Sequence, residues 1–192
     1  MKPGLSMSAF DFLAVLFSVI LGLALTQILQ GLRALMLARS RVTIYWPALI
    51  WAALMILIVA QAWWGMYSMR SFQHWTFAMY GVVVVQTTLM YLAAGMALAD
   101  IPAEGPIDMR AMYFTHRGWF FGLIALTVAI TWVKDFTTMG HLSSLANAAI
   151  LALYLVLSAV AAITKWRWYH ALLAPFSVVA MIFNSAMLSQ SL

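Results

Sequence analysis

Long apolar runs separated by isolated charges form the main pattern of this chain. A charged side chain at the centre of a membrane helix costs roughly 2.5 to 3.5 kcal/mol, so charge-free intervals mark helices that can lie in lipid. Six such intervals occur, at 12–32, 42–69, 71–99, 118–133, 136–164 and 168–192. Four of them also contain turns, which leaves helical cores near 46–64, 76–98, 143–163 and 169–188. The pattern predicts an all-α membrane bundle of six transmembrane helices in a single domain, residues 1–192.

Composition supports a membrane setting and excludes several classes of protein. Apolar residues make up 66% of the chain and charged residues 8%, against roughly 45 to 50% and about 25% in soluble domains. The chain has no cysteine, which excludes disulfides, thiol nucleophiles and iron–sulfur ligation. Its 10 basic residues outnumber its 5 acidic ones, but they are scattered rather than gathered in a patch, so we expect no nucleic-acid partner.

The distribution of the basic residues predicts the orientation of the helices. Three of them, Lys2, Arg70 and Lys134, fall on the amino-terminal side. Seven fall on the other side, namely Arg33, Arg39, Arg41, Arg110, Arg117, Lys165 and Arg167. The positive-inside rule then places both termini on the non-cytoplasmic side.

The fourth interval is short for a membrane span. Its 16 residues, 118–133, cover only about 24 Å of helix, less than a hydrocarbon core of about 30 Å. We therefore expect Arg117, Lys134 or Asp135 to lie unusually deep. The preceding stretch 107–114 mixes methionine and aromatic residues with two charges and is compatible with a short interfacial helix or with a plain loop.

Polar side chains align along four of the predicted helices. Those of the first helix share a sector about 120° wide at about 100° per residue, and we expect this stripe to face the bundle interior. The aligned candidates are Asp11, Ser18, Thr26, Gln30 and Arg33, then Thr87 and Tyr91, then Asn147, Tyr154 and Ser158, and finally His170, Ser177 and Asn184. They are compatible with a polar path between the first, third, fifth and sixth helices or with contacts to a partner, and ordinary helix packing is the favoured interpretation.

Charge and histidine placement give two weaker hypotheses. Lys134 and Asp135 are adjacent and do not face each other on a helix. One hypothesis is an ion pair between Lys134 and Asp11 at the same end of the bundle, and the alternative is that all three charges are solvated. His116 and His170 form the one plausible acid–base pair for a membrane enzyme. No metal-binding or nucleophile motif accompanies any histidine, so we expect no metal, no cofactor and no enzyme activity.

The first two predicted helices and the start of the fourth carry a resemblance. The stretch 17–33 (FSVILGLALTQILQGLR), followed by Arg39, Arg41, Tyr45 and Trp46 and later by 113–121 (YFTHRGWFF), resembles a group of small bacterial multi-pass membrane proteins without an assigned activity. The resemblance implies a bacterial inner (cytoplasmic) membrane and no particular chemistry.

Two functions follow as hypotheses. Small and aromatic residues abound and a catalytic constellation is missing, which favours an accessory or scaffolding subunit. Such a subunit acts through contacts with lipids, with other membrane subunits or with its own copies. The alternative is a channel or carrier for a small neutral or weakly polar solute along the polar path.

Overall fold

The computed structural model describes residues 9–72, 74–98, 101–102, 104–141 and 144–189, with side chains of the last helix described to Ile182. Its helices are α1 (Ala9–Leu37), α2 (Trp46–Met66), α3 (Phe77–Ala97), α4 (Met109–Met139), α5 (Leu145–Ile163) and α6 (Arg167–Ser189). The predicted helical bundle is confirmed. Five helices, α1 to α5, are long and apolar enough to cross a membrane. The described part of α6 does not meet the same criteria of length and hydropathy.

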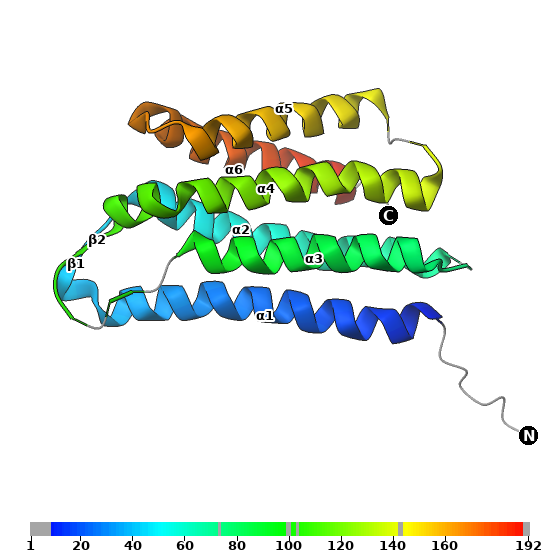
Figure 1. Ribbon diagram of the computed structural model, residues 1–192, viewed down its shortest axis with the longest axis horizontal. Coiled ribbons are helices and arrows are strands. Elements are labelled where there is room, and N and C mark those ends of the chain that lie inside the picture. The colour runs from blue at the N-terminus through cyan, green and yellow to red at the C-terminus, as the bar shows by residue number, and fades with distance from the viewer. Residues whose placement is uncertain (1–8, 73, 99–100, 103, 142–143, 190–192) are drawn as a thin grey trace, which may run out of the picture.

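The helices form two layers, and consecutive helices run in opposite directions (Figure 1). Helices α1, α3, α4 and α5 lie side by side in one layer, with α3 and α4 between α1 and α5, while α2 and α6 lie behind them. Helix α1 begins and α6 ends at the same end of the bundle. The other end holds Arg39, Arg41, Arg110 and Arg167 at or near helix termini, and we call it the basic end.

Short-range signals fix where the helices start and stop. The side chains of Thr76, Asp108 and Ser144 each accept a hydrogen bond from the first turn of α3, α4 and α5, respectively. Such caps satisfy backbone N–H groups that have no partner within the helix. Gly140 ends α4 in the left-handed conformation, with φ of 74°, which glycine adopts without steric penalty.

Helix α4 differs most from the sequence-based expectation. It has 31 residues, about 46 Å at 1.5 Å per residue, so it is longer than a hydrocarbon core rather than shorter. The charges that delimited the interval 118–133 lie inside this helix, because α4 extends beyond Arg117 and Lys134 at both ends. The stretch 107–114 is neither a separate interfacial helix nor a loop, because Ile107–Asp108 form a short strand and α4 starts at Met109.

The two connections at the basic end are tied together. Strand β1 (Val42–Thr43) pairs in parallel with β2 (Ile107–Asp108). The Arg41 guanidinium donates hydrogen bonds to the carbonyl oxygens of Gly105, at 2.8 Å, and Pro102, at 2.6 Å. Arg41 thus holds the α3–α4 connection against the α1–α2 connection.

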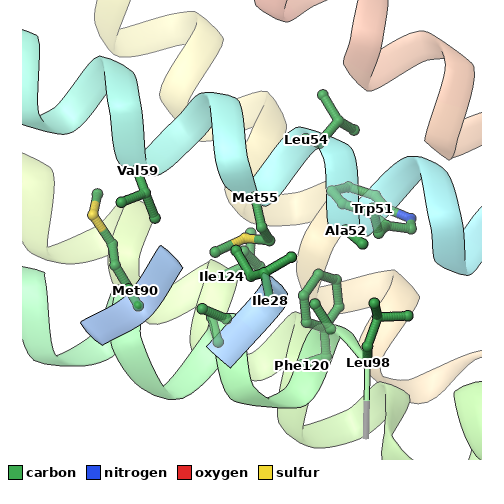
Figure 2. Packing of buried hydrophobic residues seen from close by; sticks show 14 of the residues in the cluster. Ile28, Trp51, Ala52, Leu54, Met55, Val59, Met90, Leu98, Phe120 and Ile124 are labelled. Atoms are coloured by element: carbon green, nitrogen blue, oxygen red, sulfur yellow. The ribbon is translucent and has the colours of Figure 1, made fainter. Parts of the chain in front are cut away.

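Apolar side chains fill the interior between the layers (Figure 2). Ile28, Met55, Val59, Met90 and Ile124 from four helices belong to one buried cluster. The outside is also apolar, since large side chains such as those of Phe12, Phe77, Leu145 and Leu172 are exposed; the same holds for Val179. An apolar interior with an apolar exterior is the arrangement of a helical bundle in lipid.

Candidate functional site

The polar stripe of α1 faces out of the bundle. Asp11, Ser18, Thr26, Gln30 and Arg33 are all exposed. The buried side of the helix instead carries Phe17, Leu21, Ala24 and Ile28. The prediction that the stripe faces inward is therefore wrong, and its physical reason is that α1 buries its aromatic and aliphatic side chains against α2 and α3.

The middle of this stripe has the composition of a helix contact surface. Ser18, Gly22, Thr26 and Gln30 recur at intervals of four residues, and all are exposed. The Thr26 hydroxyl donates to the Gly22 carbonyl at 2.9 Å, and Ser18 accepts from the Trp63 indole at 3.3 Å. No hydrogen bond to the Gln30 carboxamide is found among the described residues. We call these four residues the α1 outer face.

Two glycines of α1 have opposite surroundings. A Cβ atom at Gly31 would lie 2.7 Å from the Cβ atom of Leu98, so Gly31 allows α1 to approach the end of α3 closely. A Cβ atom at Gly22 would have nothing within 4 Å. Packing within the chain therefore requires glycine at position 31 and leaves position 22 without such a requirement.

Inside the bundle, two glutamines that the sequence analysis did not single out connect helices. The Gln27 side chain donates to the Tyr91 hydroxyl at 3.0 Å, joining α1 to α3. The Gln86 side chain donates to the Thr131 hydroxyl at 2.9 Å, joining α3 to α4. Among the predicted residues, Tyr91 belongs to this interhelical bonding.

A polar cavity of about 390 Å³ opens between α2, α3 and α4 at the end opposite the basic end. Its polar lining includes Gln86, Thr87, Thr131, Lys134 and Asp135. Asp135 is only 6% exposed. The cavity reaches Met90 on α3, and buried apolar residues such as Trp51, Met55 and Ile124 fill the bundle farther toward the basic end.

The structure places Lys134 and Asp11 on different surfaces of the bundle. Lys134 lines the cavity between α2, α3 and α4, whereas Asp11 lies on the exposed side of α1. Within the described parts of the chain, no ion pair joins these two residues. The cavity instead holds Lys134 beside Asp135, the sequence neighbour that the prediction had set aside.

The predicted residues of α5 and α6 do not meet the α1 stripe. Ser158 and Ser177 are buried, and the Ser177 hydroxyl donates to the Leu173 carbonyl of its own helix at 2.8 Å. The Tyr154 ring stacks on Phe176 of α6, and Asn147 is half-buried near the start of α5. Asn184 lies beyond the described side chains. With α3 and α4 between α1 and α5, the described candidates on α1, α5 and α6 do not line one common path.

His170 belongs to a buried aromatic network near the basic end. Its Nδ1 atom lies 2.9 Å from the Tyr113 hydroxyl and its Nε2 atom 3.2 Å from the Thr164 carbonyl oxygen. Because a carbonyl only accepts, Nε2 carries the proton and Nδ1 accepts from Tyr113. Both ring nitrogens are thus used in structural hydrogen bonds that join α4, α6 and the turn before α6.

Tyr45 lies beside this network, just before α2. Its ring contacts Tyr113 edge-on, with the centroids 5.2 Å apart. Burial raises the pKa of the Tyr45 phenol above its ordinary value, although the charges of Arg110 and Arg167 act to lower it. The phenol is therefore neutral at physiological pH.

These features define the class of the protein as a multi-helix membrane bundle. Comparison of the chain with protein-family models, with curated proteins and with solved structures finds no match.

Proposed function

We propose that the chain is a non-catalytic assembly subunit of a membrane, in which the α1 outer face binds another transmembrane helix. One observation carries this proposal: Ser18, Gly22, Thr26 and Gln30 lie on the exposed side of α1 rather than in the interior. The binding helix comes from a second copy of the chain or from another membrane subunit.

Lipid tails interact less favourably with the α1 outer face than a neighbouring helix does. Lipid tails cannot hydrogen-bond to the Gln30 carboxamide, whereas a neighbouring helix can offer a polar partner. Small residues four apart let two helix backbones approach closely, which increases their van der Waals contact. The empty surroundings of Gly22 leave room for such an approach.

The geometry favours assembly over the alternative of a channel or carrier. A conducting route needs polar groups through the thickness of the bundle, and proton or ion coupling uses ionisable groups near the membrane midplane. Here the polar cavity beside Lys134 and Asp135 opens at one end and reaches inward only as far as Gln86, Thr87 and Met90, near the middle of α3. From there toward the basic end, buried apolar residues such as Trp51, Met55 and Ile124 fill the interior.

For the topology, we propose that all six helices cross the membrane, with the basic end in the cytoplasm and both termini outside, as in a bacterial inner membrane. The seven basic residues on one side support this orientation. A reporter enzyme that is active only outside the cytoplasm, fused after Leu192, is expected to be active. An inactive reporter there, together with an active one fused at Arg39, would reverse the orientation.

The assembly proposal predicts a specific pair of harmful substitutions. Gly22→Leu combined with Gln30→Leu fills the close-approach site and removes the carboxamide, so we expect association to weaken at least about tenfold, or about 1.4 kcal/mol. The measurement is the mass of the complex formed by the full-length chain in mild detergent. Copies carrying two different tags that co-purify identify self-association; a larger complex without mixed tags identifies another subunit.

A matched control separates this surface from general changes of the lipid-facing exterior. Ala53→Leu combined with Thr88→Leu adds a similar bulk and removes a similar polar group at exposed positions of α2 and α3. We expect this control to leave the complex unchanged. A wild-type chain that is monomeric and has no bound subunit would contradict the proposal, as would equal losses in the two double variants.

A further inference from the structure

A second cavity, of about 520 Å³, lies at the basic end between the start of α4 and the α5–α6 turn. Its lining includes four cationic side chains and one carboxylate. Arg110 and Arg117 come from α4, Lys165 and Arg167 lie at the turn into α6, and Asp108 caps α4. We call this cavity the basic pocket. It is separate from the α1 outer face.

The positive charge of the basic pocket is not neutralised by the rest of the described chain. The Asp108 carboxylate already accepts hydrogen bonds from the backbone N–H groups of Arg110, at 2.9 Å, and Ala111, at 3.2 Å. Among the described residues, none of the four cations forms an ion pair. Cations at the start of a helix are also unfavourable to its dipole, yet Arg110 and Arg167 lie in the first turns of α4 and α6.

The wall of the pocket is held in place by Arg117. Its guanidinium donates to the carbonyl oxygens of Thr164, at 3.0 Å, and Ile163, at 3.4 Å, and to that of Phe114. These bonds join α4 to the end of α5. The other three cations, Arg110, Lys165 and Arg167, are exposed, and their charged groups are available to a ligand.

Aromatic residues indicate the depth at which this pocket lies. Trp119, Trp166 and Trp168 are all exposed, and the rings of Trp166 and Trp168 stack with centroids 5.8 Å apart. Exposed tryptophans are typical of the level of the lipid headgroups. Lys165 and Arg167 alternate with two of them along the chain, so the basic pocket lies where headgroup phosphates lie.

We propose that the basic pocket binds a phosphate-bearing anion, supplied by the headgroup of an anionic phospholipid. Basic pockets between helices on the cytoplasmic side suit such headgroups, and arginine donates to phosphate oxygens in charge-assisted hydrogen bonds. Arg110, Lys165 and Arg167 contact the anion, and Arg117 positions the turn that carries two of them.

Lipid binding to the purified full-length chain, followed by native mass spectrometry, tests this site. Phosphatidylglycerol is expected to bind and phosphatidylcholine, whose phosphate is balanced by its own cation, is not. Lys165→Gln combined with Arg167→Gln is expected to weaken phosphatidylglycerol binding about 25-fold, about fivefold for each charge removed. Arg33→Gln combined with Arg39→Gln removes two charges at the same end but outside the pocket, and is expected to bind like the wild type.

Two further arms complete the test. The exchange Lys165→Arg with Arg167→Lys keeps both charges and is expected to retain binding, which controls for damage to the fold. Glycerol 3-phosphate and inorganic phosphate at millimolar concentration distinguish the source of the anion. Binding of either would support the anion site and assign it to a soluble phosphate. The proposal would be overturned if phosphatidylglycerol and phosphatidylcholine bound equally and neither soluble anion bound. Equal losses of phosphatidylglycerol binding in the two glutamine double variants would also overturn it.

Discussion

Replacing Phe121 by alanine is expected to destabilise the folded bundle by about 3 to 5 kcal/mol. Phe121 is fully buried, and its ring contacts Trp51 edge-on, with centroids 5.1 Å apart, and His170 at 5.4 Å. Truncation leaves an empty space where α2, α4 and α6 meet. Because lipid tails are as apolar as this interior, the loss is mainly of packing contacts.

Thermal unfolding of the full-length chain in detergent measures this effect. Trp119→Ala is the matched control, since Trp119 lies two residues earlier on the same helix and is 73% exposed. We expect the control to change stability by no more than about 0.5 kcal/mol. Equal shifts of the unfolding midpoint in the two variants would mean that α4 does not bury Phe121.

Gly31→Leu is expected to destabilise the bundle by about 1 to 3 kcal/mol through overpacking. A Cβ atom there would lie 2.7 Å from the Leu98 Cβ atom and 3.3 Å from the Leu98 carbonyl oxygen. The same change at Gly22 meets no neighbour of its own chain, so the monomer is expected to keep its stability.

The two glycines therefore give a paired test of stability and association. Unfolding of the monomer is measured at a detergent concentration that separates the copies, and association is measured in mild detergent. We expect Gly31→Leu to lower the unfolding midpoint and Gly22→Leu to weaken association alone. A Gly22→Leu monomer as unstable as Gly31→Leu would contradict the outward orientation of Gly22.

The positions of the helices could be predicted from the sequence because a single physical constraint governs them. Charges are expelled from hydrocarbon, so the predicted cores 46–64 and 76–98 lie close to α2 (Trp46–Met66) and α3 (Phe77–Ala97). The ends of α4 could not be found in this way. Arg117 and Lys134 do not end that helix, because Arg117 finds carbonyl partners at the end of α5 and Lys134 faces a polar cavity.

The direction of the α1 stripe could not be deduced from the sequence. In a soluble protein water surrounds the exterior, so polar side chains face out; in lipid both sides of a helix are apolar and the pattern loses this meaning. A polar stripe then faces either the interior of its own bundle or a partner. Gln27 bonds to Tyr91 while Gln30, one turn later, is exposed, and only the packing of α1 on α3 distinguishes them.

The basic pocket could not be predicted from the sequence either. Along the chain the four cations indicate only topology, since Arg110 and Arg117 are far from Lys165 and Arg167. They become one site because α4 and α5 are neighbours and the α5–α6 turn lies beside the start of α4. The hydrogen bond from Arg117 of α4 to the Thr164 carbonyl oxygen at the end of α5 shows that these two elements are in contact.

Photo-crosslinking in native membranes tests most directly whether the α1 outer face is covered by protein. A photoreactive amino acid replaces Gly22 in one variant and Leu153, exposed on α5, in the other. We predict that the variant at Gly22 forms a covalent adduct with a second copy or with another membrane subunit, while the variant at Leu153 labels lipid. Lipid adducts alone at both positions would contradict the central claim that α1 is a binding helix.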